Sequence, residues 1–282
     1  MVIIETVFIS TFLSFIYEGI VRKVTARMQN RIGPPIWQPI LDFIKLLSKE
    51  RFEVEGSHHT FITFVSIMSV ASLISTVFMF PLVGILNFNW NFILLIYLLV
   101  FSTACFIIVG LSSPSPFPIV GSTREAILFL AYDLPLIIIL LYFAMNYKSL
   151  QLIPSNLILL FPLMFISFIV ITQAKSGYQP FNISEADQEI TAGYLTECSG
   201  FELAMFNLAK SLRVFVMVSL ATILFFNPSS ILMFFVISLI ILFIVISLRV
   251  ALARFRIDQG FKFLWVLLLP LIVIDIIKVM LI

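Results

Sequence analysis

Long runs of apolar residues dominate this chain, and short polar stretches separate them. A helix needs roughly 20 apolar residues to cross the hydrocarbon core, and it satisfies its own backbone hydrogen bonds there. Pro135 and Pro162 interrupt two of the runs, so we expect kinks at these positions. The runs predict eight transmembrane helices, at residues 2–21, 61–86, 92–113, 126–146, 156–174, 201–226, 229–250 and 261–282. The expected fold is an all-α integral membrane protein with one polytopic domain, 1–282.

The distribution of charge predicts the orientation of this domain. Only 11% of the residues are charged and 61% are hydrophobic, whereas a soluble domain carries about 25% charged residues. With eight crossings, Lys148 and Lys278 are the basic residues that fall on one side of the membrane. Most of the others fall in or beside four loops on the opposite side, at 22–60, 114–125, 175–200 and 250–261. The positive-inside rule places these loops in the cytoplasm and both termini outside, in a multi-pass protein of the plasma membrane.

The first of these loops contains a different kind of helix. Between residues 36 and 50, apolar side chains recur with helical spacing, at Trp37, Ile40, Leu41, Ile44 and Leu47. This pattern predicts an amphipathic helix on the membrane surface, with Pro39 in its first turn. It is either a lipid anchor or a docking platform for a cytoplasmic partner. Glu50, Glu53 and Glu55 make the end of the loop acidic, which lipid anchoring alone would not favour.

Charged residues also lie inside or beside two predicted spans. Asp133 follows Glu125 by eight residues, so the two lie near one helical face, roughly 12 Å apart. A charge at the bilayer centre costs at least about 2.5–3.5 kcal/mol, so Asp133 is expected to face the interior or a water-filled path. Glu202, Lys210 and Arg213 share one face of a later span. They indicate either a polar ion path or a structural ion network.

The cytoplasmic loop at 175–200 is strongly acidic. Ser184 and Asp187 have the spacing of a helix cap, and Gly193 suits a helix end, so a structural role is one interpretation. Crowded carboxylates are also expected to have raised, coupled pKa values, which suits proton translocation. The acidic residues of the loop are Glu185, Asp187, Glu189 and Glu197.

Residues that hold metals or redox centres are scarce. Cys105 and Cys198 form no C-x-x-C pair, and the only histidines, His58 and His59, are adjacent in a loop. We therefore expect no metal site and no iron–sulfur cluster in this chain.

Three separated blocks of sequence resemble a known family. Residues 27–34, RMQNRIGP, are similar to the family pattern R-x-Q-x-R-x-G-P. Residues 38–50, which contain Gln38-Pro39 and Lys49-Glu50, match the block that follows. The loop PFNISEADQEITAGYLTECSG is similar to P-F-D-L-x-E-x-E-x-E-L-x-x-G-x-x-x-E-Y. The chain thus resembles, over nearly its whole length, the membrane "heel" subunit shared by respiratory complex I and the group 4 membrane-bound [NiFe] hydrogenases.

The resemblance implies roles for two sets of residues. One set would dock a hydrophilic redox arm, namely Arg27, Arg31, Trp37, Asp42, Lys45, Lys49 and Glu50. The other would couple electron transfer to proton or ion movement, namely Glu125, Asp133, Glu185, Asp187, Glu189, Glu197, Glu202, Lys210 and Arg213. Expected partners are hydrogenase-like large and small subunits, iron–sulfur subunits and antiporter-like membrane subunits, with the lipid membrane and without nucleic acid. The nickel–iron and iron–sulfur centres would belong to these partners, so this chain would bind no cofactor and hold no catalytic residue.

Two departures from the family pattern favour its hydrogenase branch. Asn182 stands in place of the usual Asp, and Lys210 stands where the complex I type tends to have an acid. The segment ARFRIDQ at 253–259 also looks hydrogenase-like. The expected function is that of a membrane subunit in an ion-translocating, ferredoxin-driven oxidoreductase, which moves H⁺ or Na⁺.

Three alternatives stay open from the sequence. The first is the heel subunit of a quinone-reducing complex I. The second is a passive anchor for the redox arm, although an anchor has no reason to carry the buried charges. The third, from another class, is a stand-alone secondary ion transporter, although the sequence has neither an internal repeat nor paired broken helices.

Overall fold

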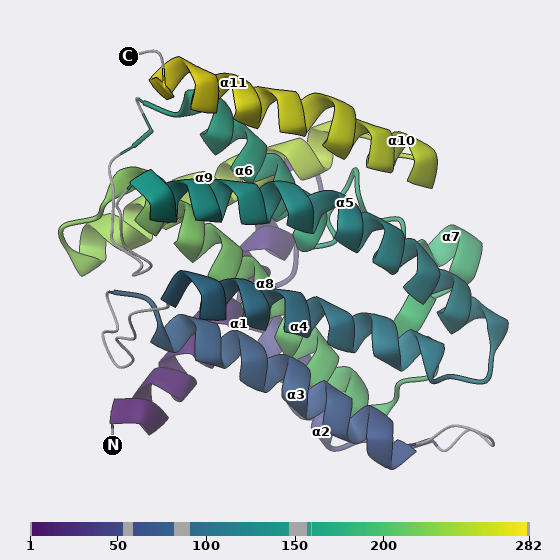
Figure 1. Ribbon diagram of the computed structural model, residues 1–282. Helices are drawn as coiled ribbons and strands as arrows, with labels where there is room; N and C mark the ends of the chain where they lie inside the picture. The colour runs from purple at the N-terminus through teal and green to yellow at the C-terminus, as the bar shows by residue number, and fades with distance from the viewer. Residues whose placement is uncertain (1, 53–58, 82–90, 147–156, 159, 281–282) are drawn as a thin grey trace.

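Helices make up most of the chain, as the apolar runs predict (Figure 1). The computed structural model describes residues 2–52, 59–81, 91–146, 157–158 and 160–280. Within these ranges there is no strand, and seven helical stretches are long and apolar enough to cross a membrane. Six of them are single helices: α1 (Val2–Met28), α3 (His59–Phe78), α4 (Asn91–Leu111), α5 (Pro116–Asn146), α8 (Gly200–Phe226) and α9 (Ile231–Ala251). The seventh is a continuous stretch that consists of α10 (Ile257–Lys262), a π-helical turn (Phe263–Leu268) and α11 (Leu269–Met280). The all-α membrane class is therefore confirmed. Parts of the predicted ranges lie outside the described residues: 53–58 (with Glu53, Glu55 and His58), 82–86, 147–156 (with Lys148), 159 and 281–282.

The fifth predicted span, 156–174, is a shorter helix. α6 (Pro162–Lys175) has 14 residues, which is about 21 Å of helix and less than the thickness of the hydrocarbon core. Pro162 stands at the start of α6 instead of kinking it, because proline at the first helical position needs no N–H donor. At the described residues just before α6, the Ile158 amide donates to the carbonyl of Phe225 at the end of α8. Non-helical backbone is tolerated at membrane depth where protein surrounds it.

The fourth span begins ten residues earlier than predicted. We expected a loop at 114–125 and a helix from residue 126, but α5 is helical from Pro116. Pro116 and Pro118 lie in its first turn, where backbone N–H groups have no partner inside a helix, so neither proline interrupts it. The extension matters because Glu125 becomes part of the same rigid helix as Asp133.

The amphipathic helix in the first loop is confirmed as α2 (Gln38–Leu47), with Pro39 in its first turn. Its buried side faces α1 and α8. Phe43 packs against Phe15 with a ring-centroid distance of 5.2 Å, and the carbonyl of Ile36 lies so close to Gly19 that any Cβ there would stand 1.9 Å from it. The opposite side of α2 exposes apolar side chains, including Trp37, Leu41, Ile44 and Leu47.

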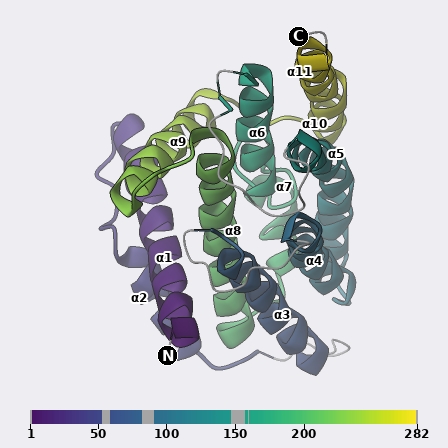
Figure 2. The ribbon, with the colours of Figure 1, turned by 60° about the vertical axis from the view of Figure 1, so that its left-hand side comes forward.

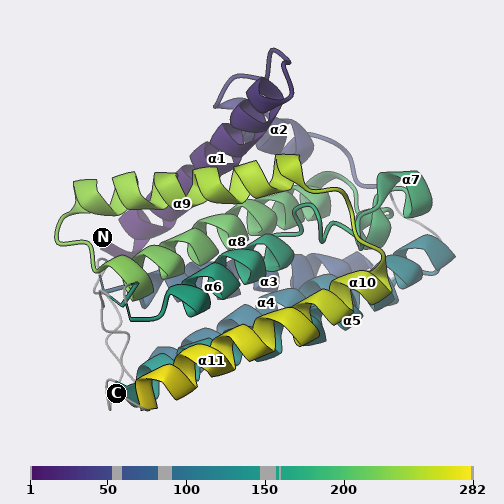
Figure 3. The same cartoon turned by 90° about the horizontal axis from the view of Figure 1, so that it is seen from above.

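α8 is the central helix of the bundle, and α1, α3, α6 and α9 all pack on it (Figure 2). Viewed from above, α9, then α8 with α6, then α11 with α5 form successive rows (Figure 3). α1, α4, α6 and α9 finish at one end of the bundle, and α5, α8 and α10 begin there. We call this the charged end. It also carries α7 (Asp187–Ile190), whereas both termini lie at the opposite end (Figure 1).

Candidate functional site

An ion pair between α5 and α6 lies inside the bundle. Nζ of Lys175, the last residue of α6, is 2.5 Å from Oδ1 of Asp133. The lysine side chain has no exposed surface, and that of Asp133 is 5% exposed. Asp133 therefore faces the interior, as predicted. The assignment of Lys175 to a polar cytoplasmic loop was wrong, because its side chain points into the protein and neutralises a buried carboxylate, which would be very costly alone.

A second group of polar side chains adjoins this pair. The hydroxyl of Tyr132 donates to Oε1 of Glu125 at 3.1 Å. Nη1 of Arg213 lies 4.0 Å from the same oxygen and donates to the backbone carbonyl of Lys175 at 3.1 Å. The guanidinium is also 4.2 Å from the centre of the Phe106 ring. Arg213 thus connects α8 to both α5 and the end of α6.

The third group joins the acidic loop to α8. Nζ of Lys210 is 2.6 Å from Oε1 of Glu185, and the hydroxyl of Tyr194 donates to the same carboxylate. Burial alone would raise the pKa of Glu185, but the neighbouring Lys210 ammonium and further hydrogen bonds hold it below its usual value. Burial and the Glu185 charge together raise the pKa of the Tyr194 hydroxyl well above its usual value. Glu185 is therefore ionised at neutral pH, beside a tyrosine that keeps its proton.

The three groups are neighbours. Arg213 and Tyr194 both contact the Phe106 ring, and Arg213 contributes to lowering the pKa of Glu185. We call the following set the ionic chain: Asp133, Lys175, Glu125, Arg213, Glu185 and Lys210. Several of its polar atoms have no hydrogen-bond partner among the described residues, namely Oδ2 of Asp133 and Nε and Nη2 of Arg213. Buried polar atoms without a partner are costly at low dielectric.

The carboxylates of the acidic loop that the structure describes have different surroundings. Glu189 pairs with Arg124 of α5 at 2.5 Å and is 55% exposed. Oε2 of Glu197 is buried without a hydrogen-bond partner, and the side chain of Asp187 lies outside the described part of the structure. The expectation of raised pKa values is wrong for Glu185, because its own cation outweighs the effect of burial.

The local structure of this loop also differs from the predicted cap. α7 begins after Ala186, and Ser184 makes no capping hydrogen bond to it. Gly193 does not end α7 but has a φ of +60°, and a Cβ there would lie 2.0 Å from the carbonyl oxygen of Ser184. Only glycine fits such a position. This close packing places Tyr194 beside Glu185.

The remaining predicted coupling residue, Glu202, has a different partner. Its carboxylate is 3% exposed and accepts a hydrogen bond from the Thr63 hydroxyl of α3 at 2.8 Å. The sequence placed Glu202, Lys210 and Arg213 on one face of α8. Lys210 and Arg213 reach the acidic loop and α5, whereas Glu202 is held by α3 and forms no ion pair with the described side chains.

The predicted docking residues lie at the charged end of the bundle. Asp42 is paired, since its Oδ2 accepts from Arg22 at 2.8 Å. The other docking side chains are exposed, namely Arg27, Arg31, Trp37, Lys45, Lys49 and Glu50.

The sequence analysis missed two further polar groups. Asp275 of α11 is 1% exposed, and its Oδ2 accepts from the Met164 amide at the start of α6 at 2.8 Å. Glu18 of α1 accepts from the Tyr178 hydroxyl at 2.9 Å, and the Tyr178 ring lies 4.3 Å from the Arg249 guanidinium. Both acids stand alone inside apolar runs, and this was the signal that could have identified them.

We expect Asp275→Leu to lower the stability of the protein by about 1–3 kcal/mol, because it leaves the Met164 amide without a partner at membrane depth. Asp275→Asn keeps an acceptor oxygen and should lose much less. Thermal unfolding in detergent compares the two variants with the wild type. Equal stability of the Leu variant and the wild type would contradict this role.

The fold and site define an integral membrane protein with a chain of paired charges inside its helix bundle. Comparisons with known proteins agree with this class. The NADH dehydrogenase family matches residues 1–280, so the chain belongs to this family. It is 30% identical to the H-type subunit of NADH-quinone oxidoreductase from Protochlamydia amoebophila, over 91% of this chain and 88% of that protein. It is 29% identical to the same subunit from Brevibacillus brevis, over 98% and 90%.

A solved structure is also similar. It is a chain of the membrane-bound sulfane sulfur reductase, an archaeal respiratory membrane complex, with a TM-score of 0.88, 28% identity and 98% coverage of both chains. The family resemblance inferred from the three sequence blocks is thus confirmed, and both of its branches are represented among the relatives.

Proposed function

We propose that this chain is the membrane subunit of a ferredoxin-driven oxidoreductase complex, where it anchors the hydrophilic redox arm and couples electron transfer to translocation of H⁺ or Na⁺. The ionic chain is the observation that carries this proposal. It runs from Glu185 of the acidic loop and Lys210 of α8 to the buried pair of Asp133 and Lys175. Unsatisfied atoms within it argue against a purely structural network, which would gain by satisfying them.

The mechanism has three steps. Electron transfer in the docked arm changes charge or conformation next to the acidic loop. Glu185 responds because its ionisation depends on the balance between burial and the Lys210 charge. Arg213 has a hydrogen bond to the carbonyl of Lys175 and a looser contact with Glu125. It then shifts between these neighbours and alters the pair of Lys175 and Asp133. Antiporter-like partner subunits would receive this change.

The charged end supplies the docking surface in this proposal. Its exposed Arg27, Arg31, Lys45, Lys49 and Glu50 would contact hydrogenase-like large and small subunits and iron–sulfur subunits, which hold the redox centres. The exposed apolar side of α2 would lie on lipid or on a partner. In this orientation the charged end is cytoplasmic and both termini are outside.

A quinone-reducing complex is the second candidate, because the curated relatives are subunits of NADH-quinone oxidoreductases. Two observations favour the hydrogenase-like branch. Lys210 forms an ion pair with Glu185, whereas an acid at this position would repel it. Asn182, in place of the usual Asp, leaves its Oδ1 buried without a hydrogen-bond partner. Identifying the co-purifying subunits by mass separates these candidates, since a nickel-ligating partner selects the hydrogenase branch. A chain that purifies alone and transports ions would instead be a secondary transporter.

Changing Glu189 and Glu197 to glutamine together should preserve ferredoxin oxidation and abolish ion translocation, because the loop would lose two carboxylates that respond to the docked arm. The purified complex in sealed liposomes provides both measurements: ferredoxin absorbance, and proton uptake in the presence and absence of Na⁺. Glu5→Gln, which replaces an exposed carboxylate of α1 at the opposite end of the bundle, serves as the matched control. Normal translocation in the double variant would leave the loop with only a structural role.

A further inference from the structure

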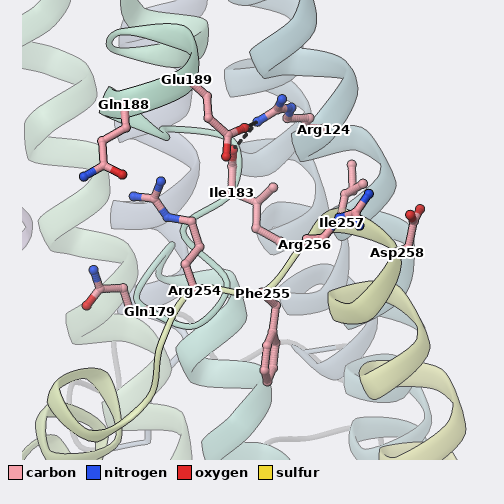
Figure 4. A pocket seen from close by; sticks show the side chains of 10 residues that line it. All are labelled: Arg124, Gln179, Ile183, Gln188, Glu189, Arg254, Phe255, Arg256, Ile257 and Asp258. Carbon is pink, nitrogen blue, oxygen red and sulfur yellow. Dashed lines mark hydrogen bonds and ion pairs between the residues drawn. The ribbon is translucent and has the colours of Figure 1, made fainter.

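A polar hollow of about 610 Å³ opens at the charged end, and no residue of the ionic chain lines it (Figure 4). Three parts of the chain surround it: the start of α5, the acidic loop with α7, and the connection between α9 and α10. Arg124, Gln188 and Glu189 line one side, and Arg254 and Asp258 line another. The predicted docking and coupling sets include only Glu189 from this lining.

Arg254 has no partner for its guanidinium among the described residues. Arg124 is already neutralised by Glu189 at 2.5 Å. Arg254 is half-buried, forms no ion pair with any described side chain, and has a buried Nε without a hydrogen-bond partner. In Figure 4 its guanidinium extends into the hollow between Gln179 and Gln188. A half-buried guanidinium with a free donor favours a planar anion that accepts two hydrogen bonds.

The backbone that carries Arg254 is fixed in place. The amide of Phe255 donates to the carbonyl of Pro180 at 3.0 Å. The Phe255 ring packs on Phe181 and Phe263, with centroid distances of 5.7 and 5.4 Å. Arg254 is therefore presented on a rigid segment, so binding there costs little ordering of the main chain.

The lining favours a protein segment over a lipid headgroup. Clusters that bind anionic lipids are uniformly basic, whereas two exposed carboxylates, Glu189 and Asp258, stand among the arginines here. Gln179 and Gln188 offer amide donors and acceptors, which match a peptide backbone. Mixed polar linings of this kind are typical of the rims of protein–protein interfaces.

We propose that this hollow docks an acidic segment of a water-soluble partner subunit, with a carboxylate of that segment bound to Arg254. The proposal rests on the membership of the chain in a multisubunit complex and does not require that the chain translocate ions. A failure of the experiment below would therefore leave the proposed coupling untouched.

The test uses the purified complex with Arg254→Lys, which places a primary amine where the guanidinium stood. A water-soluble carbodiimide then joins amines to carboxylates that are in contact. Mass spectrometry should find an amide bond between position 254 and an Asp, Glu or C-terminal carboxylate of another subunit. Cross-links only to Glu189 or Asp258 of this chain, or none at position 254, would overturn the proposal.

A charge reversal gives an independent measurement. Arg254→Glu should speed the dissociation of one subunit from the complex about 30-fold or more, because it places a carboxylate against a carboxylate. Lys262→Glu, an exposed reversal on α10 outside the hollow, should leave that rate unchanged. Equal rates in both variants would contradict the proposal. If phospholipase treatment of the wild type reproduced the effect of Arg254→Glu, the ligand would be a lipid phosphate and the proposal would also fall.

Discussion

Replacing Lys175 with methionine will destabilise the protein by about 3–5 kcal/mol, since it leaves the Asp133 carboxylate unpaired inside the bundle. The ammonium of Lys175 is wholly buried and lies 2.5 Å from that carboxylate. Adding Asp133→Asn to the same chain should recover most of the loss, because the uncompensated charge disappears. The measurement is the thermal unfolding of wild type, both single variants and the double variant, read as a double-mutant cycle.

Ion translocation should follow a different pattern from stability. We expect it to be absent in the single variants and in the double variant, because each breaks the ionic chain even where stability returns. Lys278→Met, an exposed lysine on α11, is the control for the loss of a lysine and should behave like wild type. If the stable double variant translocated ions at the wild-type rate, the pair would serve only the fold.

Lys210→Met should leave ferredoxin oxidation and membrane insertion intact but abolish ion translocation. The Lys210 ammonium is the charge that offsets the burial of Glu185, at 2.6 Å. Without it, Glu185 takes up a proton, and its ionisation no longer changes when the docked arm changes. The measurement is proton or sodium uptake by sealed liposomes that contain the purified complex, divided by the electrons transferred. Lys210→Arg keeps the charge and should retain part of the coupling.

The pH dependence provides a readout that a structural defect would not produce. In the wild type the pKa of Glu185 lies below its usual value, so its pairing stabilises the protein above the pKa of the unfolded carboxyl. This contribution is lost as the pH falls through the lowered folded-state pKa. In Lys210→Met only the Tyr194 hydrogen bond and the Arg213 charge still oppose the effect of burial, so the pKa of Glu185 should rise, and its carboxyl infrared band should appear at a higher pH. An unchanged titration of Glu185 would contradict the role assigned to Lys210.

Helices and their amphipathic patterns could be predicted because they depend on local sequence. The apolar runs located the long membrane helices, and the spacing of Trp37, Leu41 and Ile44 located α2. The ends of the helices were less predictable, because a helix does not end where its apolar stretch ends. α5 therefore extends from Pro116 through the polar residues before its apolar part.

The ionic chain could be predicted only in part. The cost of a charge in the membrane was enough to single out Asp133, Lys210 and Arg213, since this cost applies whatever the fold. The same cost applies to Asp275, although no role was predicted for this residue. Lys175 could not be identified in this way, because it stands at the boundary between an apolar run and a loop. From sequence alone, its side chain is equally suited to water or to a buried partner.

By itself, then, the sequence determined which residues enter the membrane and which charges need an explanation, because hydropathy and the cost of burial are properties of each segment. The tertiary structure decided which charges meet. The pairs of Asp133 with Lys175 and of Glu185 with Lys210 join residues that are distant in the chain. They form because α5, α6 and α8 pack together and Gly193 lets the acidic loop fold onto them. Pairing energy depends on distances of a few ångströms between helices, and no local pattern encodes those distances.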